Sequence, residues 1–96
     1  MSDTVDVLPG AARELRKLPA KTRTALLLRL VSLRADPRPE NAKKIEGPEN
    51  LWRIREGDYR LLYQIRDTAL LVLVVRAGHR REVYRKVSRL LRSLPE

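Results

Sequence analysis

LWRIREGDYRLLYQIRDTALLVLVVR, residues 51–76, is the stretch of sequence that decides the fold. Two short polar connections divide it into three runs of strand length, which predict strands over Leu51–Arg55, Tyr59–Arg66 and Ala69–Arg76. Because the connections are short, neighbouring strands run antiparallel and form a meander. Every residue from Leu70 to Val75 is apolar, which indicates a central strand buried on both faces.

The residues before this stretch predict a strand and a pair of helices. Thr4–Leu8 alternates polar and apolar side chains, as a short strand does. Ala11, Leu15 and Leu18 recur at the spacing of an amphipathic helix that stops near a proline, and a second helix is expected from about Ala20 to Ala35. The two helices form a hairpin that covers one face of the sheet.

The remaining segments complete the predicted domain. Prolines keep the stretch that leads to Gly47-Pro48 out of helical geometry, so we expect a polar loop there. After Gly78 a final helix is expected, and its apolar residues at helical spacing are Val83, Val87, Leu90, Leu91 and Leu94. Residues 1–96 are therefore expected to form a single α+β domain of order β-α-α-β-β-β-α. Its small, mostly antiparallel four-stranded sheet carries an N-terminal helical hairpin and a C-terminal helix.

Composition excludes several classes of protein. A chain of 96 residues is long enough for one compact core. The absence of cysteine excludes a disulfide framework, a thiolate zinc site and a cysteine nucleophile, and a single histidine argues against a histidine-rich metal site. The longest apolar run, Ala69 to Val75, is far shorter than the ~20 residues that cross a bilayer, so we expect a cytoplasmic protein with no membrane partner.

The charge indicates an acidic partner. With 21 Lys+Arg against 12 Asp+Glu the formal charge is +9, and most of the cations are arginine, which suits bidentate contacts with phosphate and carboxylate. From Arg76 to Arg92 there are seven cations and one acid. Such a surface suits a nucleic acid or an acidic protein. A solvated helix, whose late cations Arg89 and Arg92 complement the helix dipole, is the simpler interpretation of that pair.

Three arginines of the first predicted hairpin fall on one surface. In the strand that begins at residue 51, Arg53 and Arg55 point away from the face that carries Trp52 and Ile54. The tight turn that follows brings Arg60 back beside Arg55 or Arg53. Guanidinium groups on one surface repel one another unless a counter-charge lies between them. We interpret this concentration as a site for a polyanion.

The segment GHRREVY, residues 78–84, combines groups that suit an anion. Gly78 permits a sharp change of direction into a helix N-terminus, where free N–H groups favour anions. Arg80 and Arg81 strengthen that preference. His79 is the residue type that titrates near neutrality, and Tyr84 offers a ring for base stacking. Two simpler interpretations stay open: His79 caps a turn, and Tyr84 is half-buried against the sheet.

Four segments together resemble the RelE branch of the RelE/ParE superfamily of toxins. They are ARELRKLP (12–19), LWRIR (51–55), GDYRLLY (57–63) and GHRREVYR (78–85). The resemblance implies the toxin of a type II toxin–antitoxin system, which cleaves mRNA in the ribosomal A site. It also implies chemistry without a metal or other cofactor, in which the ribose 2′-OH attacks the adjacent phosphorus and leaves a cyclic phosphate and a free 5′-OH.

The same resemblance implies roles for individual residues. Arg53 and Arg55 would contact the phosphate and the neighbouring backbone. Arg60 would neutralise charge on the scissile phosphate as it builds. Arg80 would lie near the leaving oxygen, and Tyr84 would orient the 2′-OH or stack on a base.

One departure from the family concerns proton transfer. Relatives often place lysines where this chain has Leu51 and Arg53. Arginine clamps a phosphate well but is a poor proton shuttle, because its pKa lies above ~12. His79 is therefore a further candidate for donating or accepting a proton. A catalyst that relies on the ribosome to align its substrate is expected to cleave free RNA poorly.

The other cations divide between two expected partners. Those assigned to mRNA and ribosomal RNA are Arg55, Arg76, Arg81 and Arg85. Those assigned to a cognate acidic antitoxin are Arg85, Arg89 and Arg92. Promoter DNA is expected as a partner only through the toxin–antitoxin complex.

Two other functions stay open. ParE-like members of the superfamily share the fold but resemble inhibitors of DNA gyrase without nuclease activity. The joint presence of Arg60, Arg80 and Tyr84 favours the ribonuclease over that alternative. A basic binding module without catalysis would keep the same charge.

Overall fold

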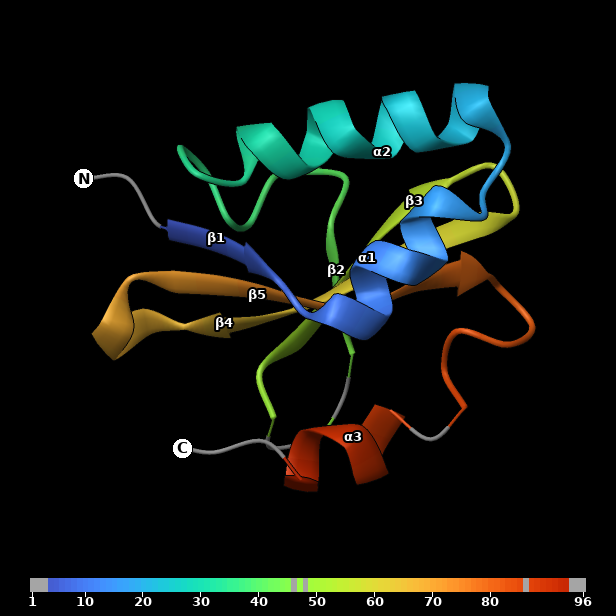
Figure 1. Ribbon diagram of the computed structural model, residues 1–96. Helices are drawn as coiled ribbons and strands as arrows, with labels where there is room; N and C mark the ends of the chain where they lie inside the picture. Colours follow the sequence, from blue (N-terminus) through green and yellow to red (C-terminus); the bar gives the residue numbers. More distant parts are fainter. Residues whose placement is uncertain (1–3, 46, 48, 86, 94–96) are drawn as a thin grey trace.

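A computed structural model describes residues 4–45, 47, 49–85 and 87–93. Its elements follow one another along the chain (Figure 1). They are β1 (Thr4–Val7), α1 (Pro9–Arg16), α2 (Ala20–Ser32), β2 (Lys43–Ile45), β3 (Leu51–Glu56), β4 (Tyr59–Arg66), a 3₁₀ turn (Asp67–Ala69), β5 (Leu71–His79) and α3 (Val87–Ser93).

The strands form one sheet in the order β1-β5-β4-β3-β2. The predicted meander of β3, β4 and β5 is confirmed, and β1 joins β5 in parallel, with Thr4 opposite Leu71. The α+β class and the N-terminal helical hairpin are confirmed as well. The expectation of four strands is wrong, because β2 pairs antiparallel with β3 and adds a fifth. β2 has only three residues, of which one is apolar, so the sequence shows no alternation there. The segment becomes a strand because it pairs with β3.

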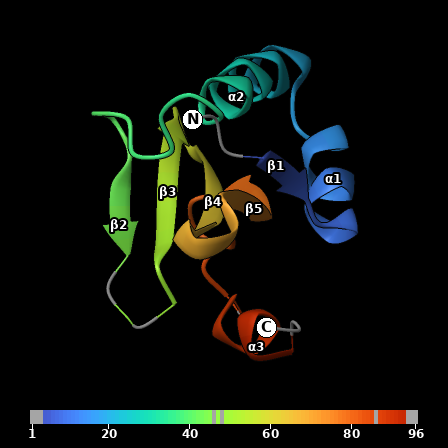
Figure 2. The same cartoon turned by 90° about the vertical axis from the view of Figure 1, so that its left-hand side faces the viewer.

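Two layers of helix lie on opposite faces of this sheet. Figures 1 and 2 show α1 and α2 on one side and α3 on the other. The hairpin side encloses the larger core, in which Leu26 and Leu33 of α2 and its loop pack on Ile54, Tyr63 and Val74 of the sheet. The α3 side encloses a smaller core, and its buried members are Leu51, Leu62, Leu73, Val75, Val83 and Val87. β5 contributes to both cores, which confirms its prediction as a strand buried on both faces.

The helical hairpin is held by its turns and by the loop after α2. Pro9 occupies the first turn of α1, where a missing N–H costs nothing. α2 ends at Ser32, three residues earlier than expected, and tighter turns continue through 33–35. In the loop that follows, the Pro37 carbonyl accepts a 2.8 Å hydrogen bond from the buried Tyr63 hydroxyl. This bond fixes the path from α2 to β2.

The C-terminal part differs most from its prediction. β5 continues to His79, so Gly78 lies inside the strand and does not turn the chain, because residues 59–62 of β4 still pair with it there. Residues 80–85 form turns, and the final helix begins at Val87. Leu94 lies outside the described residues. Within the described part of the chain, no helix is long and apolar enough to span a membrane.

Candidate functional site

Among the residues that the structure describes, Arg60 is the one cation with a buried side chain. It begins β4 directly after the turn at Gly57, whose φ of 59° suits glycine, and the residue is only 9% exposed. Its Nη1 donates to the carbonyl oxygens of Gly57, at 2.8 Å, and Tyr59, at 3.0 Å. Among the described residues, no carboxylate lies within ion-pair distance of it. A buried charge without a counter-charge is costly, so another source of negative charge is needed to offset it.

The strand register surrounds Arg60 with further cations. The tight turn predicted Arg60 beside Arg55 or Arg53, and the register of β3 and β4 places Arg55 directly opposite it. Arg53, two residues earlier on the same face of β3, lies opposite Lys43 of β2. On the other side of Arg60 stands Gly78 of β5, which has no side chain to compete for the space. The result is a cationic row at one end of the sheet.

The turn after β5 brings Arg80 to the same end. The Arg80 backbone N–H donates a 2.8 Å hydrogen bond to the Asp58 carbonyl, in the turn between β3 and β4. Its side-chain Nε lies 3.6 Å from the Asp58 carboxylate, and both side chains are more than half exposed. This exposed pair is weak, so the Arg80 guanidinium is available to a stronger anion.

Tyr84 follows in the same turn. Its neighbour Val83 is fully buried in the smaller core and anchors the segment, whereas Tyr84 itself is 39% exposed. The simpler interpretation, in which Tyr84 is half-buried, agrees with this value, and the exposed part of its ring remains open to a partner. Arg81 and Arg85 are exposed beside it.

His79 points to the opposite face of the sheet. It stands opposite Tyr59, and the two rings meet edge to face with centroids 5.7 Å apart, on the side covered by α1 and α2. A β-bulge between Leu62 and Tyr63 of β4 shifts the register with β5 and reverses which residues of β5 face α3. His79 Nδ1 accepts a 3.2 Å hydrogen bond from the Arg81 N–H. The simpler interpretation, in which His79 caps a turn, matches this geometry.

Comparisons with known proteins identify relatives of this chain. The family model described as the ParE toxin of the type II toxin–antitoxin system, parDE, matches residues 5–84. The chain belongs to the RelE/ParE superfamily of type II toxins. The mRNA interferase toxin RelE of Escherichia coli (strain K12) is 38% identical over 88 residues, which make up 88% of this chain and 92% of that relative.

Solved structures of E. coli RelE agree with the assignment to the RelE branch. A mutant of that toxin in the free state has a TM-score of 0.79 and 32% identity, and the match covers 98% of this chain and 100% of the other. The intact E. coli RelBE toxin–antitoxin complex contains a chain with a TM-score of 0.71 and 32% identity, with 81% and 96% covered. The predicted resemblance to RelE is therefore confirmed.

In this RelE-like toxin the side chain of Arg76 is bound by other groups of the same chain. Its Nη2 lies 2.8 Å from the Glu14 carboxylate of α1, and its Nη1 donates to the carbonyl oxygen of Arg85. The second Glu14 oxygen accepts a 3.2 Å hydrogen bond from the Ala77 N–H, on the edge of β5 beyond the reach of β1. Arg76 thus ties α1, β5 and the turn of Tyr84 together, and the structure separates it from the exposed arginines.

The arginines of α3 lie on the surface of the protein. Arg89 and Arg92 are exposed, while Leu90 and Leu91 pack toward the smaller core. These arginines therefore remain accessible to a partner of the toxin, on the face that also carries Arg60.

Lys43 is a candidate site residue that the sequence analysis missed. It is exposed and stands next to Arg53 in the sheet, at the end of the cationic row. The two adjacent lysines are visible in the sequence. The position of Lys43 beside Arg53, however, depends on the pairing of β2, and that segment was expected to be a loop.

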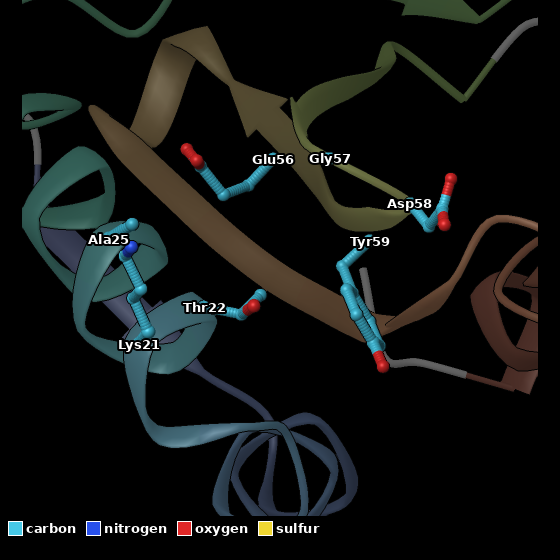
Figure 3. Close-up of a pocket in the computed structure, with 7 residues that line it drawn as sticks. All are labelled: Lys21, Thr22, Ala25, Glu56, Gly57, Asp58 and Tyr59. Carbon is cyan, nitrogen blue, oxygen red and sulfur yellow. The ribbon is translucent and has the colours of Figure 1, made fainter.

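A hollow on the other side of the sheet has mixed charge. Figure 3 shows it between Lys21 and Thr22 of α2 and the turn that carries Glu56 and Asp58. Glu56 is already paired with Arg29 at 3.0 Å. Because carboxylates line the hollow, it is less suited to a phosphate than the cationic row.

Proposed function

We propose that this toxin is an endoribonuclease that cleaves mRNA in the ribosomal A site, in the cytoplasm. The observation that carries the proposal is Arg60, a buried guanidinium without a carboxylate, in a row with Arg53, Arg55 and Lys43. A phosphodiester backbone supplies the missing negative charge. The RelE relative of E. coli, which bears the name mRNA interferase, supports the same activity.

The reaction uses only groups of the RNA and the protein. The ribose 2′-oxygen loses its proton and attacks the adjacent phosphorus, and the bond from phosphorus to the 5′-oxygen breaks. The products are a 2′,3′-cyclic phosphate and a 5′-OH that has gained a proton. Arg60 stabilises the doubly negative phosphorane, since a preorganised cation acts most strongly where charge develops away from water. Arg80 lies near the leaving oxygen and Tyr84 orients the 2′-OH or stacks on a base.

Positioning of the RNA falls to the surrounding cations. Arg53, Arg55 and Lys43 bind the backbone along the sheet, and Arg81 and Arg85 contact RNA from the turn. His79 acts as a positioning residue, because its ring caps the turn and faces away from Arg60. The residues assigned to the site around Arg60 include no side chain of a type that titrates near neutrality, so proton transfer contributes little to the rate. The rate then depends on the ribosome to align the RNA. Free RNA is therefore cleaved poorly.

The test is primer extension on ribosome-bound mRNA during in-vitro translation. Arg60→Ala is expected to lower the cleavage rate by about 10²–10³-fold, the cost of losing one preorganised charge donor. Arg66→Ala, at the opposite end of the same strand, removes an arginine without touching the row and is expected to leave the rate within about twofold. Intact mRNA with the wild-type toxin would refute the proposal.

Gyrase inhibition is the second candidate, because the family model that matches carries the ParE description. A supercoiling assay with purified gyrase distinguishes the two. Inhibition by both the wild type and Arg60→Ala, together with intact mRNA, would favour the gyrase target. Normal supercoiling and intact mRNA together would leave a basic binding module.

We further propose a cognate acidic antitoxin as the protein partner. Support comes from the E. coli RelBE complex, in which a toxin of this fold is assembled with its antitoxin. Arg85, Arg89 and Arg92 offer an exposed basic surface for an acidic, partly disordered chain that orders on binding. Binding to promoter DNA then belongs to the complex rather than to the toxin alone.

A further inference from the structure

The outer face of α2 is apolar although it lies on the surface. Leu28 is 69% exposed, Val31 62% and Leu27 44%. The inner face of the same helix buries Leu26 and Leu30 in the larger core. A helix that is apolar on both sides is typical of one that is covered on both sides.

This apolar stripe extends along the length of the helix. Ala20 and Thr24 are exposed one turn apart, and Leu28 and Val31 continue the line at helical spacing. The centre of the outer face therefore carries no charge over its three turns. In a chain with 34% charged residues, that is an unusual surface to leave in water.

The borders of the stripe are positive. Residues 15–35 contain cations and no acidic residue. Lys21 and Arg34 are exposed beside the stripe, and no carboxylate of the described residues pairs with either. An apolar strip between positive borders is complementary to a helix or strand with one apolar face and acidic flanks.

We propose that the outer face of α2 binds an amphipathic, acidic segment of the antitoxin. This inference rests on the proposed toxin function and adds a second contact surface to the one on α3. Apolar side chains of the segment cover Leu27, Leu28 and Val31, and its carboxylates lie against Lys21 and Arg34. Because α2 and α3 lie on opposite sides of the sheet (Figures 1 and 2), the antitoxin has to pass around an edge of the sheet to reach both.

A second copy of the chain is the competing occupant. Two chains of charge +9 would bring the same positive borders together, and like charges across an interface oppose association. An acidic partner relieves that repulsion instead. The charge therefore selects the antitoxin over a toxin dimer.

The affinity of the full-length antitoxin, the product of the gene adjoining that of the toxin, tests the inference by calorimetry. Leu28→Glu is expected to raise Kd by about 100-fold, since it places a charge at the centre of the interface. Lys21→Glu/Arg34→Glu is expected to raise Kd by about tenfold, with a smaller effect at high salt. Leu70→Glu makes the same change at another exposed leucine, in the turn before β5, and is expected to leave Kd within about twofold.

Measurements of folding, oligomeric state and cleavage complete the test. Circular dichroism should show all variants folded, since the substituted side chains are exposed. An unchanged Kd for folded Leu28→Glu would overturn the inference, as would a wild-type dimer that Leu28→Glu dissociates. Cleavage of ribosome-bound mRNA is measured separately: if the wild type does not cleave, the proposed function fails, while the Kd values still report on α2.

Discussion

The two sides of the sheet are built differently. The side under α1 and α2 holds the larger core, and its contacts link every strand except β2 to the helical hairpin. The side under α3 holds a core of six buried residues, and the same side carries Arg53, Arg55 and Arg60. Stability and charge are thus concentrated on opposite faces. The separation lets one face tolerate mutually repelling cations, because the other supplies most of the buried apolar area that stabilises the fold.

The largest expected effect comes from matched leucine truncations on the two sides. Leu26→Ala removes a fully buried side chain of the larger core, and we expect a loss of about 3–5 kcal/mol in the free energy of unfolding. Leu62→Ala removes an equally buried side chain of the smaller core and is expected to cost about 2–3 kcal/mol, because fewer buried residues surround it and they relax more easily. Urea denaturation measures both. Equal losses would contradict the difference between the two sides.

An effect of intermediate size concerns Tyr63 and alkaline pH. Burial, followed by the nearby Asp36 carboxylate, raises the pKa of Tyr63 above its ordinary value. From pH about 10 upward the unfolded chain loses the phenol proton while the folded chain keeps it, so stability falls by up to about 1.4 kcal/mol per pH unit. Tyr63→Phe is expected to flatten this fall relative to the wild type between pH 9 and 11.

The control for that series is the same pair of proteins at pH 7, where the difference in stability reports the lost hydrogen bond from Tyr63 to the Pro37 carbonyl. The change in that difference between pH 7 and pH 11 reports the phenol proton. The same slope in Tyr63→Phe and the wild type would show that the larger core does not hold the phenol in its neutral form.

The smallest effect on stability is expected at Arg60, despite its burial. Arg60→Met removes an unpaired cation together with two hydrogen bonds to carbonyl oxygens, and these contributions oppose each other. We expect the free energy of unfolding to stay within about 1 kcal/mol of the wild type while cleavage is lost. A large destabilisation would mean that Arg60 holds the hairpin rather than the substrate.

Much of the fold followed from local patterns. Two short turns, alternation in the first strand and a continuous apolar run in the last predicted β3, β4 and β5. The tight turn before Arg60 predicted Arg55 or Arg53 beside it, and the strand register selected Arg55. The helical hairpin followed from apolar spacing and prolines. Two predictions failed for the same reason: β2 was expected to be a loop, and the final helix was expected to begin earlier than it does. Both segments are decided by pairing or packing with residues distant in the sequence.

The sequence by itself determined the class of the fold, the family and the charge of the surface, because these depend on residue types and local spacing. Only the tertiary structure decided which side chains meet. The bulge between Leu62 and Tyr63 turned His79 away from Arg60, and β2 placed Lys43 beside Arg53. Likewise the ion pair with Glu14 occupies Arg76 and separates it from the exposed arginines. A one-residue change of register moves every later side chain to the opposite face of a strand, and alternation along one strand carries no record of it.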